Sequence, residues 1–345
     1  MPFLLLALAC LVLGLAPAPP AVQIARYPAP YTVRELTLGP DGNIWFIPEA
    51  PAAPSLSVLG VASGLVTTYD ALTDDELVCE AQHGVHELGI ISGPGSDLWV
   101  SVACGAALQN GFSGFNLATT NGTVTSDVRE RRNAPQIVGF DSGGDGNVWA
   151  DLQFISPPQS VEGYGSATDS VCRASLPAGA QGAITSGPDF ANWLPSNNAT
   201  SAQLVRVTTT CAVSVVATVE GSSFALNTIV SADGSLWLID RTRSRIVRFG
   251  TAGLETDYAL PEPFGGSGYL AAAPSSPYVY FSDTRNGEVG RVDVRTGRVE
   301  EYGLEDAGAT FAPADMAIDA AGNVWTHSGS TILKITFPNE AARSI

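Results

Sequence analysis

Thr37-Leu38-Gly39-Pro40-Asp41-Gly42-Asn43-Ile44-Trp45-Phe46 is the stretch that decides the fold of this 345-residue chain. Asp-Gly-Asn between two apolar runs is typical of a tight hairpin turn, because Gly and Asn tolerate a positive φ. The stretch therefore predicts two short antiparallel strands, with Trp45 at the start of the second.

The same pattern recurs along the whole chain, and an aromatic anchor marks each copy. The anchors lie 43 to 54 residues apart, at Trp45, Trp99, Trp149, Trp193, Trp237, Tyr280 and Trp325. A second apolar hairpin follows several of these turns, for example at 245–258. Units of about 45 residues with four strands are typical of propeller blades. The sequence predicts an all-β, seven-bladed β-propeller of four-stranded blades, with a linear solenoid as the alternative.

The two ends of the repeat region complete each other. The last unit ends one strand short, at Phe337-Pro338, while residues 22–28 resemble an outer strand without a unit of its own. We expect this N-terminal strand to pair with the last blade and close the ring, which removes exposed sheet edges. The propeller should span residues 22–338, followed by a C-terminal tail at 339–345.

The N-terminus predicts a secreted, extracellular protein. An apolar run over residues 3–15 has the length of a signal-peptide core and is too short for a membrane span. We therefore expect a signal peptide over residues 1–18, with the cleavage site open between 16 and 21. Two sequons, at Asn121 and Asn198, are candidate glycosylation sites. An even number of cysteines in the mature chain predicts two disulfides, with three pairings open, among Cys79, Cys104, Cys172 and Cys211.

The composition excludes several classes of partner. The formal net charge is −17, so phosphate backbones and anionic membrane surfaces would be repelled. No internal apolar run reaches the length of a membrane-spanning helix. We expect a monomer whose partner is a small molecule or glycan, not a nucleic acid or a membrane.

The turn motif, with an outer hairpin that ends in Tyr258-Ala259-Leu260-Pro261, resembles the virginiamycin B lyase (streptogramin lyase) family over essentially the whole mature chain. The resemblance implies an elimination that begins with removal of a proton α to a carbonyl, with Mg²⁺ as cofactor. In the family a histidine stands eleven residues before the tryptophan, and a glutamate that helps hold Mg²⁺ stands three residues after it.

Neither family residue is retained at those positions. Eleven residues before the anchors, this chain has Arg34, Leu88, Val138, Gly182, Leu226, Tyr269 and Ala314. Three residues after them it has Pro48, Val102, Leu152, Ser196, Asp240, Asp283 and Ser328. We therefore expect no linearisation of streptogramins, and the sequence indicates no metal ligands.

Candidate site residues come from segments that lead into inner strands, because that face of a propeller surrounds the axis. Residues 80–87 hold two of the three histidines, and a Cys79–Cys104 disulfide would fix this loop. His83 and His86 are candidate general bases, with Glu87 beside them as a substrate-binding residue. In the alternative, the histidines only cap strand ends. For the third histidine, His327, we expect a structural role.

Two further residues stand at matching positions, counted from their anchors. Arg34 and Tyr269 are therefore expected to point into the same funnel, Arg34 to bind a substrate carboxylate and Tyr269 to act as an acid. The sequence supports two functions about equally: a lyase that breaks C–O bonds in a small molecule or uronate glycan, and a non-catalytic propeller that binds a ligand or protein. Lactonase-type hydrolysis is a third and weaker alternative.

Overall fold

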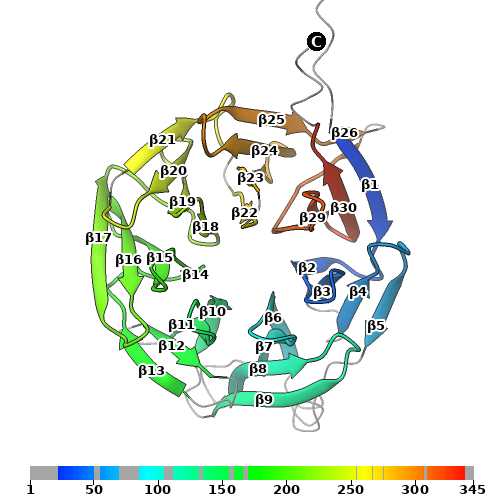
Figure 1. The fold of residues 1–345 in the computed structure, drawn as a ribbon, viewed down its shortest axis with the longest axis horizontal. Coiled ribbons are helices and arrows are strands. Elements are labelled where there is room, and N and C mark those ends of the chain that lie inside the picture. Colours follow the sequence, from blue (N-terminus) through cyan, green and yellow to red (C-terminus); the bar gives the residue numbers. More distant parts are fainter. Residues whose placement is uncertain are drawn as a thin grey trace, which may run out of the picture.

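The computed structural model forms a closed ring of seven four-stranded antiparallel sheets around a central axis (Figure 1). It describes residues 22–49, 55–69, 85–104, 112–131, 135–154, 159–165, 170–253, 255–265, 267–274, 276–306 and 309–338. The predicted seven-bladed β-propeller is confirmed, and the linear solenoid is wrong. Within these residues, no helix is long and apolar enough to span a bilayer.

The first six blades run from the axis outward in chain order. The first three blades comprise β2 (Val33–Leu38), β3 (Ile44–Pro48), β4 (Leu56–Leu59) and β5 (Val66–Tyr69); β6 (Val85–Ser92), β7 (Leu98–Cys104), β8 (Phe112–Ala118) and β9 (Val124–Arg131); and β10 (Gln136–Ser142), β11 (Val148–Gln153), β12 (Ser160–Tyr164) and β13 (Ser170–Ser175). Blades four and five comprise β14 (Thr185–Ser186), β15 (Asn192–Asn197), β16 (Ser201–Val207) and β17 (Val213–Glu220); and β18 (Val230–Ala232), β19 (Ser235–Asp240), β20 (Arg245–Phe249) and β21 (Glu255–Ala259).

The last two blades include the closure of the ring. Blade six comprises β22 (Leu270–Ala272), β23 (Tyr278–Asp283), β24 (Glu288–Asp293) and β25 (Val299–Gly303), and a two-stranded ribbon, β26 (Glu305–Asp306) and β27 (Ala309–Thr310), follows it. Blade seven comprises β28 (Met316–Ile318), β29 (Val324–Ser328), β30 (Thr331–Thr336) and, outermost, β1 (Gln23–Pro28). The N-terminal strand β1 pairs antiparallel with β30, from Gln23 opposite Thr336 to Pro28 opposite Thr331 (Figure 1). The predicted closure is confirmed.

The repeated motif is explained by how its turn holds the anchor indole. In blade one, Asp41 accepts hydrogen bonds from the backbone N–H of Asn43 (3.1 Å) and from Nε1 of Trp45 (3.0 Å). A Cβ on Gly39 would lie 2.3 Å from Cδ1 of Trp45, so the indole covers a position that only glycine can occupy. Gly42 has a φ of 76°, which favours glycine. The motif therefore encodes a turn and a seat for the indole.

The indoles belong to the core between blades. All six tryptophans are at most 1% exposed. Trp45 of blade one packs with Ile90 and Leu98 of blade two, and Trp193 of blade four packs with Leu236 of blade five. Burial of such large apolar surfaces is the main stabilising term in folding.

One disulfide joins two neighbouring blades. Cys172 on β13 is bonded to Cys211, in the turn between β16 and β17. Cys79 lies outside the described residues, as does the side chain of Cys104, so the pairing proposed there stays a prediction. The same holds for the signal peptide over 1–18 and the tail over 339–345. Both sequon residues, Asn121 and Asn198, are exposed in turns, and their glycosylation stays a prediction.

Candidate functional site

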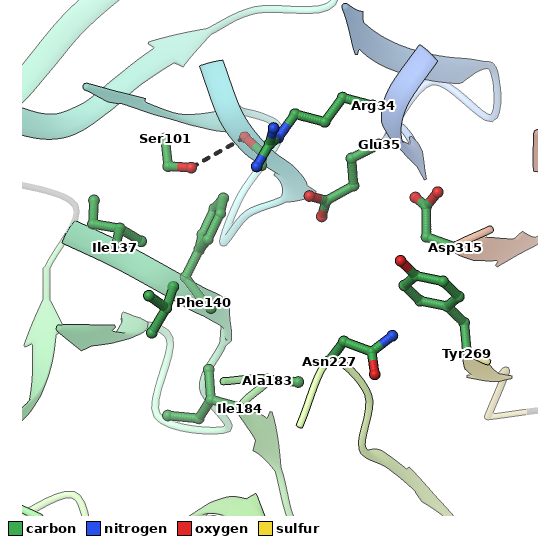
Figure 2. Close-up of a pocket in the computed structure, with 13 residues that line it drawn as sticks. Arg34, Glu35, Ser101, Ile137, Phe140, Ala183, Ile184, Asn227, Tyr269 and Asp315 are labelled. Carbon is green, nitrogen blue, oxygen red and sulfur yellow. Dashed lines mark hydrogen bonds between the residues drawn. The ribbon is translucent and has the colours of Figure 1, made fainter. Parts of the chain in front are cut away.

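A cavity of about 400 Å³ lies where the inner strands of the seven blades meet. Every blade contributes to its lining, which comprises Arg34, Glu35, Gly89, Ser101, Ile137, Val138, Gly139, Phe140, Ala183, Ile184, Asn227, Tyr269 and Asp315. Figure 2 shows that the lining has an apolar and a polar side. Apolar side chains come from blades three and four, and polar side chains come from blades one, five, six and seven. A pocket of this size and mixed lining suits a small molecule.

Close backbone packing on the apolar side requires residues without large side chains. A Cβ on Gly89 would lie 2.7 Å from Cε1 of Phe140 and 3.0 Å from Oε2 of Glu35. A Cβ on Gly139 would lie 2.1 Å from the carbonyl oxygen of Gly182. These glycines let the inner strands approach one another beside the cavity, and side chains there would change its shape.

The polar side is built around Asp315, which stands just before the inner strand of blade seven. Its Oδ2 accepts a hydrogen bond of 2.7 Å from the backbone N–H of Leu36 in blade one. Its Oδ1 lies 2.6 Å from Nε2 of His327, an ion-pair distance, although the angle is not that of a hydrogen bond. Glu35 of blade one and Tyr269 of blade six project toward Asp315, and Asn227 of blade five points toward Tyr269 (Figure 2).

Burial makes the chemistry of these groups unusual. Burial, and after it the charge of Asp315, raise the pKa of Glu35 from 4.5 to about 8, although Arg34 and a hydrogen bond with the backbone of Ile90 act to lower it. Burial and Asp315 also raise the pKa of Tyr269, against a hydrogen bond with Asn227. At neutral pH, Glu35 therefore holds a proton in a low-dielectric cavity.

Two of the five predicted catalytic and substrate-binding residues line this cavity. The side chains of the other three lie outside the described part of the structure. Arg34 and Tyr269 are both lining residues. His83 lies outside the described residues, and of His86 and Glu87 only the backbone, in β6, is described. Whether the histidines act on a ligand stays a prediction.

The register of Tyr269 differs by one residue from the predicted one. In blade one, Thr37 faces the anchor Trp45, whereas in blade six Ala271 faces Tyr280, because the blade-six turn is one residue longer. Tyr269 therefore corresponds to Glu35, not to Arg34. The expectation that Tyr269 and Arg34 share a repeat position was wrong, although both reach the cavity.

Sequence reasoning missed Glu35, Asp315, Asn227 and the contact of His327. A signal existed, because Glu35 and Asp315 both stand ten residues before their anchors, in blades that become neighbours when the ring closes. Acids at the same inner position of adjacent blades must come together near the axis.

The residues present do not fit the Mg²⁺ that the family resemblance implies. Of the positions three residues after the anchors, only Asp240 and Asp283 carry acids. The Asp240 carboxylate is paired with Arg243 and accepts backbone N–H groups of its own loop. The Asp283 carboxylate accepts the N–H groups of Gly265, Arg285 and Asn286. Across the described ranges, no three His, Cys, Asp or Glu side chains are grouped as metal ligands would be.

Comparisons with known proteins identify the fold. A streptogramin B lyase structure superposes with a TM-score of 0.72 at 19% identity, covering 92% of this chain and 98% of that chain. The chain has the fold of the virginiamycin B lyases. The Staphylococcus aureus virginiamycin B lyase gives a TM-score of 0.71 at 17% identity, covering 92% of this chain and 100% of that chain. A catalytically inactive variant of that enzyme with quinupristin gives 0.71 at 16% identity, with the same coverage.

These similarities are structural. No family model matches the sequence. No curated protein matches it either.

Proposed function

We propose that the central cavity binds a small polar molecule and carries out acid–base chemistry on it, as a lyase that breaks a C–O bond. One observation carries the proposal: Glu35, which retains its proton at neutral pH, shares a buried cavity with Asp315. A carboxyl group whose surroundings keep it protonated near neutral pH is suited to act as a general acid.

The lining offers a complete set of groups for a β-elimination. Asp315 would take the proton from the carbon α to a carbonyl or carboxylate. The electron pair of that C–H bond forms a C=C bond as the C–O bond to the leaving group breaks. The leaving oxygen then takes a proton from Glu35 or from the hydroxyl of Tyr269.

Arg34 makes a carboxylate-bearing substrate the best match. A guanidinium at the cavity would pair with the substrate carboxylate and stabilise charge that develops on it as the α proton leaves. A uronate residue of a glycan carries both a carboxylate and a β-oxygen leaving group. His83, His86 and Glu87 are additional candidates because β6, which carries the latter two, also carries Gly89 at the cavity.

The test is incubation of the purified protein with polyuronates. Elimination would create a C=C bond conjugated to the carboxylate, which absorbs in the ultraviolet. Asp315→Asn should lower the rate by about 10²- to 10⁴-fold, while Asp257→Asn on the outer strand β21 serves as the matched control and should leave it unchanged. Equal rates in the Asp315→Asn variant and the wild type would exclude Asp315 as the base.

Replacement of both His83 and His86 by Ala tests the earlier hypothesis separately. If the histidines supply the base, activity should disappear while the melting temperature stays nearly unchanged. If Asp315 is the base, this double variant should keep most of its activity.

The second candidate function is non-catalytic binding at the same cavity. The polar lining of blades one, five, six and seven supports it without any proton transfer. It predicts saturable binding of uronate oligosaccharides by calorimetry with no product formed, insensitive to chelators. If the protein neither converts nor binds any of the uronates tested, both the lyase and the binding function are wrong.

Streptogramin linearisation is not the activity we propose. Allowing for the shifted turns of blades five and six, the positions that carry histidine in the family hold Arg34, Leu88, Val138, Gly182, Asn227, Gly268 and Ala314. We expect no linear product when the protein is incubated with quinupristin, measured by mass spectrometry. Its appearance would show that a different base performs the family reaction here.

We also propose that the protein is secreted as a monomer. The Cys172–Cys211 bond supports an oxidising compartment, because disulfides persist there and are rare in reducing ones. Expression in a secretory host, with N-terminal sequencing and glycosidase treatment, tests cleavage between residues 16 and 21 and glycan attachment at Asn121 and Asn198.

A further inference from the structure

Blade six lacks a contact that five of the other blades make at their turns. In five blades the anchor indole donates its Nε1–H to an acid of the adjacent turn. The distances are 3.0 Å for Trp45 to Asp41, 3.1 Å for Trp149 to Asp145, 3.0 Å for Trp193 to Asp189, 2.9 Å for Trp237 to Asp233 and 2.9 Å for Trp325 to Asp319. The exception among the tryptophans is Trp99, where Gly95 stands at the acid position and Nε1 lacks a partner.

A cation from the third strand covers the indole in three of these blades. Arg206 lies 5.9 Å from the ring centroid of Trp193, Arg248 lies 5.7 Å from that of Trp237, and Lys334 lies 5.4 Å from that of Trp325. Each cation stands directly opposite its indole in the strand register. Arg206 and Arg248 also bond to the turn acids Asp189 and Asp233, so cation, indole and turn form one cluster in these two blades.

Blade six has the third-strand cation, Arg291, but a tyrosine in place of the anchor tryptophan. Arg291 stands opposite the anchor Tyr280 in the register. Instead of covering that ring, its guanidinium lies 4.3 Å from the centroid of Tyr278 and 5.3 Å from that of Phe337. It is only 4% exposed and bonds to Glu300 at 2.8 Å.

A cavity of about 270 Å³ occurs at this place, between the turns of blades six and seven. Its walls include the rings of Tyr278, Tyr280 and Phe337, and the guanidinium of Arg291. Hydrogen-bonding groups at its edge come from Ser276, Asp319, Asn323 and Thr336. In blade six the buried ring of Tyr280 stands at the anchor position in place of an indole, and the cavity lies beside it.

We propose that this cavity is a binding site for a small planar aromatic molecule of the indole class, with at least one N–H or O–H donor. Aromatic rings and a guanidinium face bind such a plane through stacking and cation–π attraction. Because Arg291 is paired with Glu300 and the carboxylate of Asp319 also lines the cavity, the site favours a neutral ligand over an anion. The site is separate from the central cavity, so the proposal does not depend on the function proposed above.

Titration of indole into the wild-type protein by calorimetry tests the proposal. The double variant Ala273→Gly/Tyr280→Trp recreates the glycine and tryptophan of the first four blades and should abolish binding by filling the cavity. Ala273→Gly alone is the matched control and should bind indole as the wild type does. Tyr269→Phe, in the central cavity, should also bind normally.

Two results would overturn the proposal. One is absence of indole binding to the wild type up to its solubility limit, and the other is unchanged binding in the double variant. If the double variant does not fold, nuclear Overhauser contacts between indole and the ring protons of Phe337 in the wild type decide the question. Contacts with Phe337 support the site, and contacts only with central-cavity residues contradict it.

Discussion

Glu35 shows how the ring changes the chemistry of a single side chain. The residue stands on an inner strand, and closure of the ring places Asp315 of the last blade beside it. Burial and this neighbouring charge together hold the Glu35 proton to about pH 8, against an ordinary value of 4.5. The protonated carboxyl is a hydrogen-bond donor that an exposed glutamate would not offer at neutral pH.

The variant Glu35→Gln should change how stability depends on pH. Between pH 4.5 and about 8 the unfolded chain has released a proton that the folded protein retains. In this window the unfolding free energy of the wild type should fall by about 1.4 kcal/mol per pH unit because of this group. The stabilising contribution of Glu35 is fully present below pH 4.5 and is lost once the pH has passed about 8. Glutamine cannot ionise and removes that contribution.

Urea unfolding of both proteins across pH 4.5 to 9 measures the difference. Burial also raises the pKa of Asp151 to about 7 and that of Asp141 to about 6, so only the difference between the two curves isolates Glu35. The exposed-strand variant Glu220→Gln is the control. Parallel curves for Glu35→Gln and wild type would contradict the inferred protonation.

At the scale of elements, the Cys172–Cys211 bond ties the outer strand of blade three to a hairpin turn of blade four. The partners are separated by 39 residues. These two blades also meet through side-chain packing, as in the cluster that joins Trp149 to Leu194 and Val205. The bond therefore reinforces one particular interface of the ring.

Replacement of both cysteines, Cys172→Ala with Cys211→Ala, should lower the unfolding free energy by about 3–4 kcal/mol. The loop-closure entropy that the cross-link removes from the unfolded chain gives this magnitude. Chemical unfolding under non-reducing conditions measures it. A loss below about 1 kcal/mol would show that packing between blades three and four suffices without the covalent link.

At the scale of the whole molecule, the ring depends on pairing between its two ends. β1 and β30 come from opposite ends of the propeller, and Tyr27 of β1 packs its ring 5.6 Å from that of Trp325. Without β1, β30 would present an unpaired sheet edge, which favours aggregation.

Deletion of residues 1–28 should destabilise the protein by at least about 2 kcal/mol and cause self-association, because hydrogen bonds along β30 and the ring contact with Trp325 are lost. Light scattering and thermal unfolding measure both effects. Deletion of residues 1–21, which leaves β1 intact, is the control. A stable monomer without β1 would show that the ring holds without its closing strand.

The repeat determined the fold because its information is local. Each turn carries the residues that hold its own indole, so Trp45 and Asp41 are four positions apart in the chain and touch in the structure. The seven units have one extra strand at the N-terminus and lack one strand at the C-terminus. Closing the ring with the N-terminal strand pairs all sheet edges. The sequence alone therefore determined the number of blades and how the ring closes.

The composition of the central cavity was decided by the tertiary structure. Glu35 and Asp315 are 280 residues apart, and the raised pKa of Glu35 depends on burial that no local motif records. The walls of the blade-six cavity likewise depend on three-dimensional packing, which places Arg291 against the rings of Tyr278 and Phe337. The contacts within a turn join residues that are close in the sequence, so the sequence predicts them. Desolvation of a side chain, and charge interactions between residues far apart in the chain, arise only when the ring has formed.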